Sequence, residues 1–449
     1  MKFDAIIIGF GNGGKTLAGA LAKQGIEVAL IERSRGMYGG TCINVGCIPS
    51  KLLVSSAAAS ELAGGGFEEK AARYAAAVAE KRRVTALLRG KNYSKLNELP
   101  KVSIFDGVGS FAAPKQVRVA LTDGGEALLE AENVFINTGS ESIIPGFPGI
   151  AGNSAAYTSE TLMDESALPR RLTLIGAGYI GMEFASMYAA FGSEVTVIQD
   201  GAVFLPKEDR DVADEIRAIL ERRGVRFLIG AKPVRLEGGN TVYEKDGAEQ
   251  LLEGDAVLLA TGRRANTAAL DAGKAGVALT PRGAVQVDEQ LRTTAPGIWA
   301  MGDVNGGPQF TFVSLDDYRI VLSQLNGGEG TRESRKNLPY SVFMSVPLGR
   351  VGLTEEQARA KGLPIKVLKL PTAAVPKAQV LRQTDGFLKA IVNTETGKIL
   401  GAALLCPEAY ELINTVKLAM DMDADYTLLR DRIYTHPTMT EAFNDLFAL

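Results

Sequence analysis

The stretch "DAIIIGFGNGGKTLAGALAKQGIEVALIE", residues 4 to 32, contains the pattern that decides the fold. An apolar run, a group of glycines, a small-residue segment and a second apolar run predict a strand, a turn, a helix and another strand. Gly9, Gly11 and Gly14 form a G-x-G-x-x-G pattern, and Glu32 ends the second apolar run about 20 residues further on. Such glycines allow a tight turn and the close approach of a pyrophosphate, and the acid accepts hydrogen bonds from a ribose. The stretch therefore predicts a βαβ unit that binds a dinucleotide.

The same pattern returns in "RLTLIGAGYIGMEFASMYAAFGSEVTVIQ", residues 171 to 199. Gly176, Gly178 and Gly181 repeat the glycine spacing, and Gln199 takes the position that Glu32 holds in the first unit. A second strand, turn, helix and strand with this spacing predicts a second dinucleotide site.

Each glycine unit is followed by a matching apolar strand that ends in a Thr-Gly step. These strands are "NVFINTGS" at 133–140 and "AVLLATGR" at 256–263, and a third, "GIWAMGDV" at 297–304, ends in Gly302 and Asp303. The repetition indicates an ancestral duplication. We therefore expect an α/β protein with two Rossmann-like dinucleotide-binding domains.

The character of the chain changes from about residue 335. Strand-like stretches ("YSVFM", "IKVLKL", "FLKAIVN") alternate with helical ones ("TEEQARAKG", "AYELINTVKLAMDM"), which predicts a separate α+β domain. We expect one domain from 1–148 together with 265–334, a second at 149–264 and a third at 335–449.

The composition excludes several classes of protein. The chain has 449 residues, of which 46% are hydrophobic and three are cysteines, so it is not a small disulfide scaffold. The N-terminal apolar run is too short for a signal peptide, and no stretch approaches the roughly 18 apolar residues of a membrane span. A net charge of -3 without a dense basic run leaves no footprint for nucleic acid. We expect a cytoplasmic protein whose partners are small molecules or a second copy of itself.

Two of the cysteines lie close together in "GGTCINVGCIPSK", residues 39 to 51. Five residues of helix rise roughly 7.5 Å, which is beyond the Cα separation that a disulfide tolerates. A bridge between Cys42 and Cys47 would need an irregular backbone, which Gly46 and Pro49 allow. The pair is a redox pair, a metal clip or two incidental thiols. Two sulfurs without a nearby histidine argue against the metal clip, and we expect no metal site.

Taken in order, these motifs resemble the class I pyridine nucleotide-disulfide oxidoreductases, which include dihydrolipoamide dehydrogenase, glutathione reductase and mercuric reductase. The resemblance covers almost the whole chain. It implies that the first domain binds FAD, that the second binds NAD(P)H and that the third mediates dimerisation. It also implies a redox-active disulfide in which Cys42 meets the substrate and Cys47 lies against the flavin. The N-terminal end of a helix would favour the thiolates that this chemistry requires.

The resemblance assigns further residues to the two cofactors. Lys51 and Glu183 match the family's catalytic pair beside the flavin, and Tyr179 matches a tyrosine that covers the flavin and swings aside for nicotinamide. The residues expected to bind FAD are Gly9, Gly11, Gly14, Glu32, Thr41, Lys51, Thr138, Gly139, Gly302 and Asp303. Those expected to bind NAD(P)H are Gly176, Gly178, Tyr179, Ile180, Gly181, Gln199 and Gly262.

The only histidine, His436, lies in "THPTMTE" near the C-terminus. It matches the family's His-Pro-Thr motif, with Glu441 five positions on. The resemblance implies that the imidazole takes the proton of Cys42 while the carboxylate holds the ring in the required tautomer. In the family this histidine reaches the active site of the other subunit, so we expect a homodimer.

The substrate is narrowed by three features. The "TCINVGCIPSK" form resembles dihydrolipoamide dehydrogenase and mercuric reductase. However, "NGGPQFTFVSLDDYR" at 305–319 lacks the Ala-His step that is usual in dihydrolipoamide dehydrogenase. The C-terminal "FNDLFAL" lacks the cysteine pair of mercuric reductase. The combination is most similar to a bacterial subgroup that resists reactive chlorine species and hypothiocyanous acid. We therefore expect the enzyme to reduce a small thiol-reactive oxidant, with hypothiocyanous acid as the first candidate.

Other interpretations remain open. The chain could be a dihydrolipoamide dehydrogenase, another disulfide reductase, a Cu(II) or Hg(II) reductase, or a non-catalytic flavoprotein that senses oxidants. Cys406 fits the chlorine-resistance subgroup but equally a buried small hydrophobe. Gln199 replaces the acid that favours NADH, and no arginine that could hold a 2′-phosphate follows before Arg210. Both nicotinamide cofactors therefore stay open.

Overall fold

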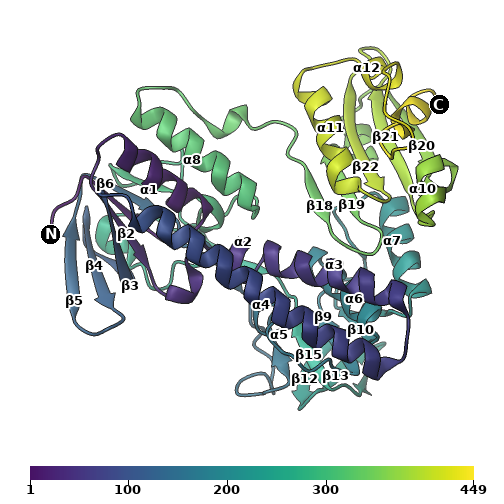
Figure 1. The fold of residues 1–449 in the computed structure, drawn as a ribbon, viewed down its shortest axis with the longest axis horizontal. Coiled ribbons are helices and arrows are strands. Elements are labelled where there is room, and N and C mark those ends of the chain that lie inside the picture. Colours follow the sequence, from purple (N-terminus) through teal and green to yellow (C-terminus); the bar gives the residue numbers. More distant parts are fainter.

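The computed structural model describes residues 1–449, which are built around one seven-stranded and two five-stranded sheets (Figure 1). The seven-stranded sheet lies in the N-terminal part and has the order β17-β6-β1-β2-β3-β4-β5. Its strands are Ile298–Ala300, Asn133–Ile136, Ala5–Ile8, Val28–Glu32, Val102–Ala113, Gln116–Leu121 and Glu126–Glu130, in that order. The strands from β17 to β3 are parallel, and β4 and β5 continue as an antiparallel meander.

Helices surround this sheet and connect it to the rest of the molecule. They are α1 (Asn12–Lys23), α2 (Thr41–Asn44), α3 (Cys47–Ala63), α4 (Phe67–Asn97) and α8 (Thr311–Leu325), with 3-10 turns η1 (Arg35–Met37), η2 (Ala272–Ala275) and η3 (Gly302–Asn305). The 31-residue helix α4 runs from the N-terminal sheet to the second sheet (Figure 1).

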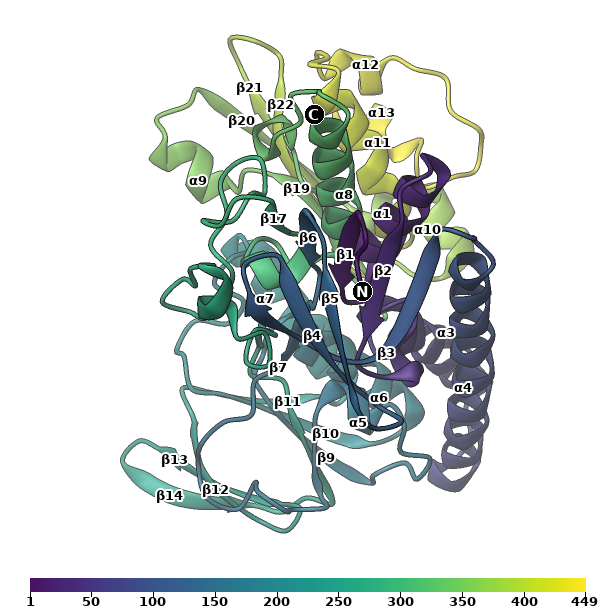
Figure 2. The same ribbon diagram turned by 90° about the vertical axis from the view of Figure 1, so that its left-hand side faces the viewer.

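The second sheet is parallel and has the order β11-β10-β9-β15-β8. Its strands are Arg226–Ile229, Glu194–Gln199, Arg171–Ile175, Ala256–Leu259 and Ala156–Tyr157, and its helices are α5 (Ser159–Leu162), α6 (Tyr179–Phe191) and α7 (Arg210–Arg222). An antiparallel sheet of β12 (Lys232–Glu237), β13 (Asn240–Lys245) and β14 (Ala248–Leu252) projects from it on the side away from the C-terminal sheet (Figure 2). The pair β7 (Ser140–Ser142) and β16 (Arg263–Ala265) links the two parallel sheets.

The C-terminal sheet is antiparallel and has the order β18-β19-β22-β21-β20. Its strands are Tyr340–Val342, Leu348–Gly352, Ile399–Leu405, Phe387–Asn393 and Ile365–Pro371. The surrounding helices are α9 (Glu355–Ala360), α10 (Pro376–Leu381), α11 (Ala409–Asp421), α12 (Thr427–Arg430) and α13 (Ala442–Leu446), with turns η4 (Arg332–Ser334) and η5 (Thr372–Ala374).

Strand β1 shows why an uninterrupted apolar run forms a central strand. All four of its residues are buried, because a parallel sheet is covered on both faces. Ile6 and Ile8 pack into the core beside the meander, whereas Ala5 and Ile7 pack into the core that contains Leu17 of α1. Alternate side chains of a strand point to opposite faces, so one run of isoleucines fills two cores.

One stretch, Thr41–Ala63, is long and apolar enough to cross a membrane by length and composition, with a mean hydropathy of 1.3. In the structure it is not a single helix, because the chain breaks between α2 and α3 at Gly46, with φ −124° and ψ −115°. Leu53 and Ala57 of α3 pack into a core that also contains residues of α4 and α6. The stretch is therefore a packed element of this fold. The predicted class, two parallel α/β units and an α+β unit, is confirmed.

Candidate active site

A cavity of about 2770 Å³ is lined by residues from all three parts of the molecule. This volume is several times that of a pocket for one small ligand and leaves room for two extended ones. The predicted site residues that line it are Gly9, Gly11, Glu32, Thr41, Cys42, Cys47, Lys51, Thr138, Gly139, Gly178, Tyr179, Ile180, Glu183, Gly262 and Asp303. Gly14, Gly176, Gly181, Gln199, Gly302, His436 and Glu441 do not line it.

The first glycine turn is packed directly against the end of β6. A Cβ atom on Gly9, whose φ is +108°, would lie 2.3 Å from the carbonyl oxygen of Asn137. The Asn137 side chain accepts a hydrogen bond from the Gly14 amide at 2.9 Å and donates one to the Met301 carbonyl at 2.7 Å. Asn137 thus joins the turn after β1 to the segment after β17. Asn137 is not among the predicted site residues.

Glu32 lies at the end of β2 with its carboxylate held by the chain. Its two oxygens accept hydrogen bonds from the amides of Phe10 at 3.0 Å and Ser34 at 3.2 Å. Burial raises the pKa of this carboxyl group. A fixed acid beside a glycine turn suits the ribose contact predicted for it.

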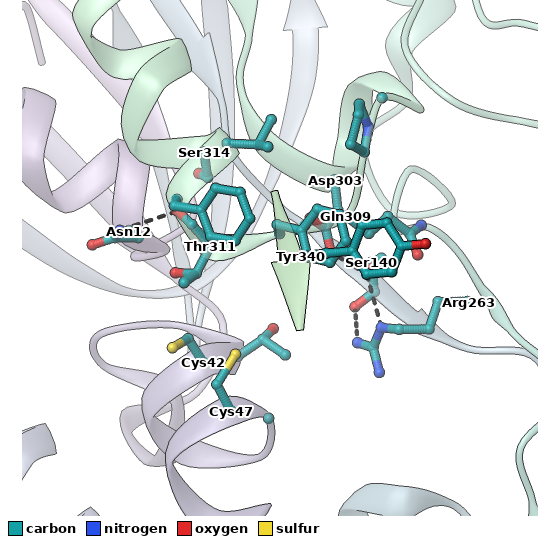
Figure 3. A pocket seen from close by; sticks show the side chains of 18 of the residues that line it. Asn12, Cys42, Cys47, Ser140, Arg263, Asp303, Gln309, Thr311, Ser314 and Tyr340 are labelled. Carbon is teal, nitrogen blue, oxygen red and sulfur yellow. Dashed lines mark hydrogen bonds between the residues drawn. The ribbon is translucent and has the colours of Figure 1, made fainter. Parts of the chain in front are cut away.

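A second polar group lies where β7 and β16 pair. The Asp303 carboxylate accepts a hydrogen bond from the Ser140 hydroxyl at 2.6 Å, and Arg263 donates to the same hydroxyl at 3.0 Å (Figure 3). Burial raises the pKa of Asp303. Nearby, Thr138 donates to the carbonyl of Asn266 at 2.7 Å. These contacts place the ends of three separate segments on one wall of the cavity.

The second glycine turn has two packed glycines and one open one. Cβ atoms on Gly176 and Gly181 would lie 2.4 Å from the Ala260 carbonyl oxygen and 2.2 Å from that of Gly176. A Cβ on Gly178 would meet nothing within 4 Å, and Gly178 immediately precedes α6. The structure therefore exposes a helix N-terminus to the cavity, which is a favourable place for a phosphate group.

The side chains of Gln199 and Arg210 both form hydrogen bonds with backbone carbonyls of their own chain. The Gln199 amide donates to the carbonyls of Gly201 and Val203, each at 2.8 Å. The Arg210 guanidinium donates to the carbonyls of Phe204 and Leu205 at 2.7 and 2.6 Å. Neither side chain is thus extended towards a ribose, and the choice between NADH and NADPH stays open.

Cys42 lies in the short helix α2, and Cys47 is the first residue of α3. Both are free thiols in this structure, and the two side chains lie next to each other near Thr311 (Figure 3). Hydrogen bonds from the Cys47 thiol and the Thr311 hydroxyl, with the positive charges of Lys15 and Lys51, lower the pKa of Cys42 to about 6. The pKa of Cys47 is raised, because its proton is shared with the Cys42 sulfur. These shifts favour the thiolate on Cys42 over that on Cys47, and the role of Cys42 as the thiol that meets the substrate stays a prediction.

Lys51 and Glu183 form a double contact near the cysteines. The Lys51 ammonium nitrogen lies 2.8 Å from each carboxylate oxygen of Glu183. The amide of Phe343 also donates to Glu183 at 2.9 Å, and Lys51 lies 4.6 Å from the centre of the Phe343 ring. The pair connects α3 to α6, and Phe343 brings the C-terminal part to the same point. Lys51 is one of the charges that act on both cysteines.

His436 and Glu441 lie together, but not at the cysteines of their own chain. The His436 Nδ1 atom is 2.8 Å from a carboxylate oxygen of Glu441, and the histidine side chain is 71% exposed. The predicted pairing of these two residues is present, and their action on Cys42 of a partner stays a prediction. Cys406 is fully buried in the core of the C-terminal sheet, and burial raises its pKa.

The residues around the cavity fit the two predicted cofactors. Two glycine turns follow central parallel strands, one has an open backbone at a helix N-terminus, and the other has a buried acid beside it. These are the features that bind pyrophosphate and ribose in dinucleotide-binding folds. The cysteine pair lines the same cavity as both turns, which suits two-electron exchange between bound cofactors and a disulfide.

Comparisons with known proteins agree with this geometry. The family model "Pyridine nucleotide-disulphide oxidoreductase" matches residues 3–317, and its dimerisation-domain model matches residues 338–447. The chain is 47% identical to the probable pyridine nucleotide-disulfide oxidoreductase RclA of Escherichia coli K12, over 100% of this chain and 99% of the relative. It is 33% identical to mitochondrial dihydrolipoyl dehydrogenase 1 of Arabidopsis thaliana, over 98% of this chain and 89% of the relative.

A solved structure of the E. coli protein, described as an HOCl-induced flavoprotein disulfide reductase, superposes with a TM-score of 0.92 and covers 100% of both chains. Its Cu(II) complex superposes with a TM-score of 0.93, over 100% of this chain and 99% of the other. The chain therefore belongs to the pyridine nucleotide-disulphide oxidoreductases, flavoprotein enzymes that use FAD and NAD(P)H.

Proposed function

We propose that this enzyme reduces a small thiol-reactive oxidant, with hypothiocyanous acid as the substrate, in defence against oxidative stress in the cytoplasm. The observation that carries the proposal is the Cys42–Cys47 pair, in which the Cys42 thiol has a pKa of about 6 and both residues line the cavity. A thiolate at neutral pH is what an electrophilic oxidant requires. The description of the E. coli relative as HOCl-induced supports the link to chlorine-derived oxidants.

The proposed reaction uses both sulfurs in turn. The Cys42 thiolate attacks the sulfur of hypothiocyanous acid, so that a sulfenyl thiocyanate forms and hydroxide leaves, which takes the proton of the Cys47 thiol and becomes water. The Cys47 thiolate then attacks the Cys42 sulfur, which forms the disulfide and releases thiocyanate. Two thiols are oxidised and one molecule of oxidant is reduced. Bound FAD and NAD(P)H supply the two electrons that reopen the disulfide.

Other residues of the chain would hold the cofactors and move the proton. The turn at Gly9 with Glu32 and Asp303 would bind FAD, and the turn at Gly178 would bind NAD(P)H. We further propose that the sequence ranges 1–148 with 265–334, 149–264 and 335–449 act as the FAD, NAD(P)H and dimerisation domains. His436, oriented by Glu441, would take the proton of Cys42 from across the dimer.

A substrate panel with purified enzyme tests the proposal. NADH and NADPH oxidation would be followed with hypothiocyanous acid, dihydrolipoamide with NAD⁺, oxidised glutathione, Cu(II) and Hg(II). We expect fast turnover with hypothiocyanous acid, which Cys42→Ser and Cys47→Ser abolish. Cys406→Ser is the matched control, because this third thiol is buried away from the cavity, and it should keep full activity. Faster turnover with dihydrolipoamide than with hypothiocyanous acid would contradict the proposal.

Cu(II) reduction is the second candidate function. The observation that favours it is that two solved structures of the E. coli relative are Cu(II) complexes. The same panel decides between the two, since a copper reductase would turn over Cu(II) faster than the oxidant. If NAD(P)H bleaches the flavin but no substrate is turned over, a sensor role is favoured instead.

A further inference from the structure

Two tyrosines in the cavity wall share one carboxylate oxygen. The hydroxyl of Tyr179 donates to Oε1 of Glu208 at 2.7 Å, and the hydroxyl of Tyr340 donates to the same oxygen at 2.5 Å. The two rings are tilted against each other with centroids 5.3 Å apart. Tyr179 and Glu208 belong to the second sheet's part of the chain, whereas Tyr340 is the first residue of β18. The contact therefore joins two parts of the molecule at the cavity.

Glu208 is a buried hydrogen-bond acceptor. Its residue is 2% exposed, and its second oxygen accepts no hydrogen bond but lies 3.5 Å from Nε of the buried Arg350. Arg350 in turn donates to the carbonyls of Val351 and Ala402, which fix its position. Burial and the neighbouring carboxylate raise the pKa of both tyrosines, so both phenols stay protonated donors. Hydrogen bonds of this kind to an ionised group are the strong ones.

Tyr179 lies at the start of α6, so its contact with Glu208 bears on the predicted NAD(P)H site. Tyr179 is the first residue of α6 and follows Gly178, whose backbone is open to the cavity. Glu183 lies one helical turn further on the same face of α6 and binds Lys51 beside the cysteines. Gly178, Tyr179 and Glu183 therefore follow one another along the side of α6 that lines the cavity. The Tyr179 hydroxyl is held from the C-terminal part of the molecule.

We propose that Glu208, together with Tyr340, is a positioning residue that latches Tyr179 across the passage from the helix N-terminus to the Lys51–Glu183 pair. The reduced nicotinamide end of the cofactor can occupy this passage only when Tyr179 gives up its bond to Glu208. The bond therefore weakens the apparent affinity for the dinucleotide, because only the molecules in which the latch is open can bind it fully. The inference rests on the proposed assignment of α6 to NAD(P)H.

Equilibrium binding tests the latch without turnover. The probes are tetrahydronicotinamide analogues of NADH and NADPH, which cannot give a hydride, and ADP-ribose, which lacks the nicotinamide. Tyr179→Phe keeps the ring and removes the hydroxyl, so it should bind the tetrahydro analogues roughly tenfold tighter, as expected for one hydrogen bond to a charged group. Its affinity for ADP-ribose should not change. Tyr74→Phe is the matched control, since it removes another buried tyrosine hydroxyl, bonded to Tyr188, outside the cavity.

Two substitutions of Glu208 complete the test. Glu208→Gln keeps the shape but removes the charge, and Glu208→Asp keeps the charge beside Arg350 but shortens the reach to Tyr179. Each should tighten binding of the tetrahydro analogues in the natural background and have no further effect in Tyr179→Phe. If Glu208→Gln does not fold, Glu208→Asp and Tyr179→Phe still decide.

Equal shifts for ADP-ribose and the analogues would overturn the latch, as would unchanged affinities. The same Glu208 effect with and without the Tyr179 hydroxyl would also overturn it. No oxidant enters the assay, so a failure of the enzyme to reduce hypothiocyanous acid would leave this result intact.

Discussion

The sulfur of Cys42 is acidified by several neighbours at once, and Thr311 is the one that can be removed most cleanly. Thr311→Val keeps the shape of the side chain but deletes the hydroxyl that donates to the sulfur. We expect the pKa of Cys42 to rise from about 6 by roughly one unit or more, since one hydrogen bond to a charged group is lost. The pH dependence of alkylation of the reduced enzyme measures this shift.

The sign of the pH effect follows from the thiolate. The pKa of Cys42 lies below the usual value for a thiol, so its reactivity is present above about pH 6 and is lost as the pH falls through that value. In Thr311→Val the loss should begin at a higher pH. Thr85→Val is the control, because this buried hydroxyl bonds the Arg82 carbonyl outside the cavity. An identical alkylation profile in Thr311→Val and the natural enzyme would show that the hydroxyl does not act on the sulfur.

Residues within a local motif could be predicted from the sequence, whereas their distant partners could not. The glycines, the two cysteines and the His436–Glu441 pair each belong to a short pattern with a known physical purpose. Asn137, Glu208 and Tyr340 do not, because their contacts come from segments that are far apart in the chain. The position of Asn137 directly before the Thr-Gly step was a usable signal, since the residues after a strand of a parallel sheet face the ligand crevice.

Among the elements, the entrance to α6 offers a direct test of the second dinucleotide site. Gly178 has an ordinary extended conformation with φ −77°, and a Cβ there meets open space. Gly178→Ala should leave the free energy of unfolding within about 1 kcal/mol of the natural value. It should weaken NAD(P)H binding, because the methyl group occupies the place where the pyrophosphate approaches the backbone. Calorimetric titration and thermal unfolding measure the two effects.

Gly176→Ala is the opposite case in the same turn. Its φ of +110° and the Ala260 carbonyl 2.4 Å from the new Cβ make the substitution strained. This variant should lose stability by more than about 1 kcal/mol. Equal stability losses in the two variants would mean that Gly178 is packed in solution and does not mark an open site.

Elements with a strong apolar pattern were predictable, and elements that depend on packing were less so. Strand β1 and its counterpart β9 follow from their apolar runs and glycine turns. The helix α4 was not singled out, since much of its length is polar and its buried positions, such as Tyr74 and Val78, are covered by α3 and α6. The length of α4 depends on the distance between the two sheets that it connects, and no local sequence pattern encodes that distance.

On the scale of the whole molecule, Lys389 joins two parts of the chain. Its ammonium group is buried and lies 2.9 Å from both Asp211 of α7 and Glu355 of α9, and 3.5 Å from Asp209. Lys389→Met should destabilise the protein by on the order of 3 kcal/mol, because a buried pair loses one partner and leaves charges uncompensated. Denaturant unfolding measures the loss.

Lys369 provides the matched comparison. It contacts the same Asp211 at 2.8 Å, but its side chain is 42% exposed, so Lys369→Met should cost no more than about 1 kcal/mol. Similar losses in the two variants would show that the cluster contributes no more than a surface ion pair.

The His436–Glu441 pair makes a prediction about the dimer. General acid–base assistance is worth about 10²- to 10⁴-fold, so His436→Ala should slow reduction of ordinary disulfides strongly. Hypothiocyanous acid should be affected less, because it is highly electrophilic and because thiocyanate, which leaves when Cys47 closes the disulfide, needs no proton. Mixing Cys42→Ser and His436→Ala chains and letting the dimers exchange should restore roughly a quarter of the sites by random pairing. If exchanged dimers show no recovery on a disulfide substrate, the histidine does not act across the interface.

The burial of Cys406 has a consequence for an enzyme that works among oxidants. A catalyst of this kind risks being its own target, yet the one thiol outside the reactive pair is enclosed in the C-terminal core and kept protonated. When reductant runs out, the Cys42–Cys47 pair in the cavity closes into a disulfide, which is a reversible form of protection. Mass spectrometry after excess oxidant should find residue 406 unmodified until the protein is unfolded. Recovery of activity after exposure to oxidant would then depend on the supply of NAD(P)H, because the third cysteine is not irreversibly oxidised.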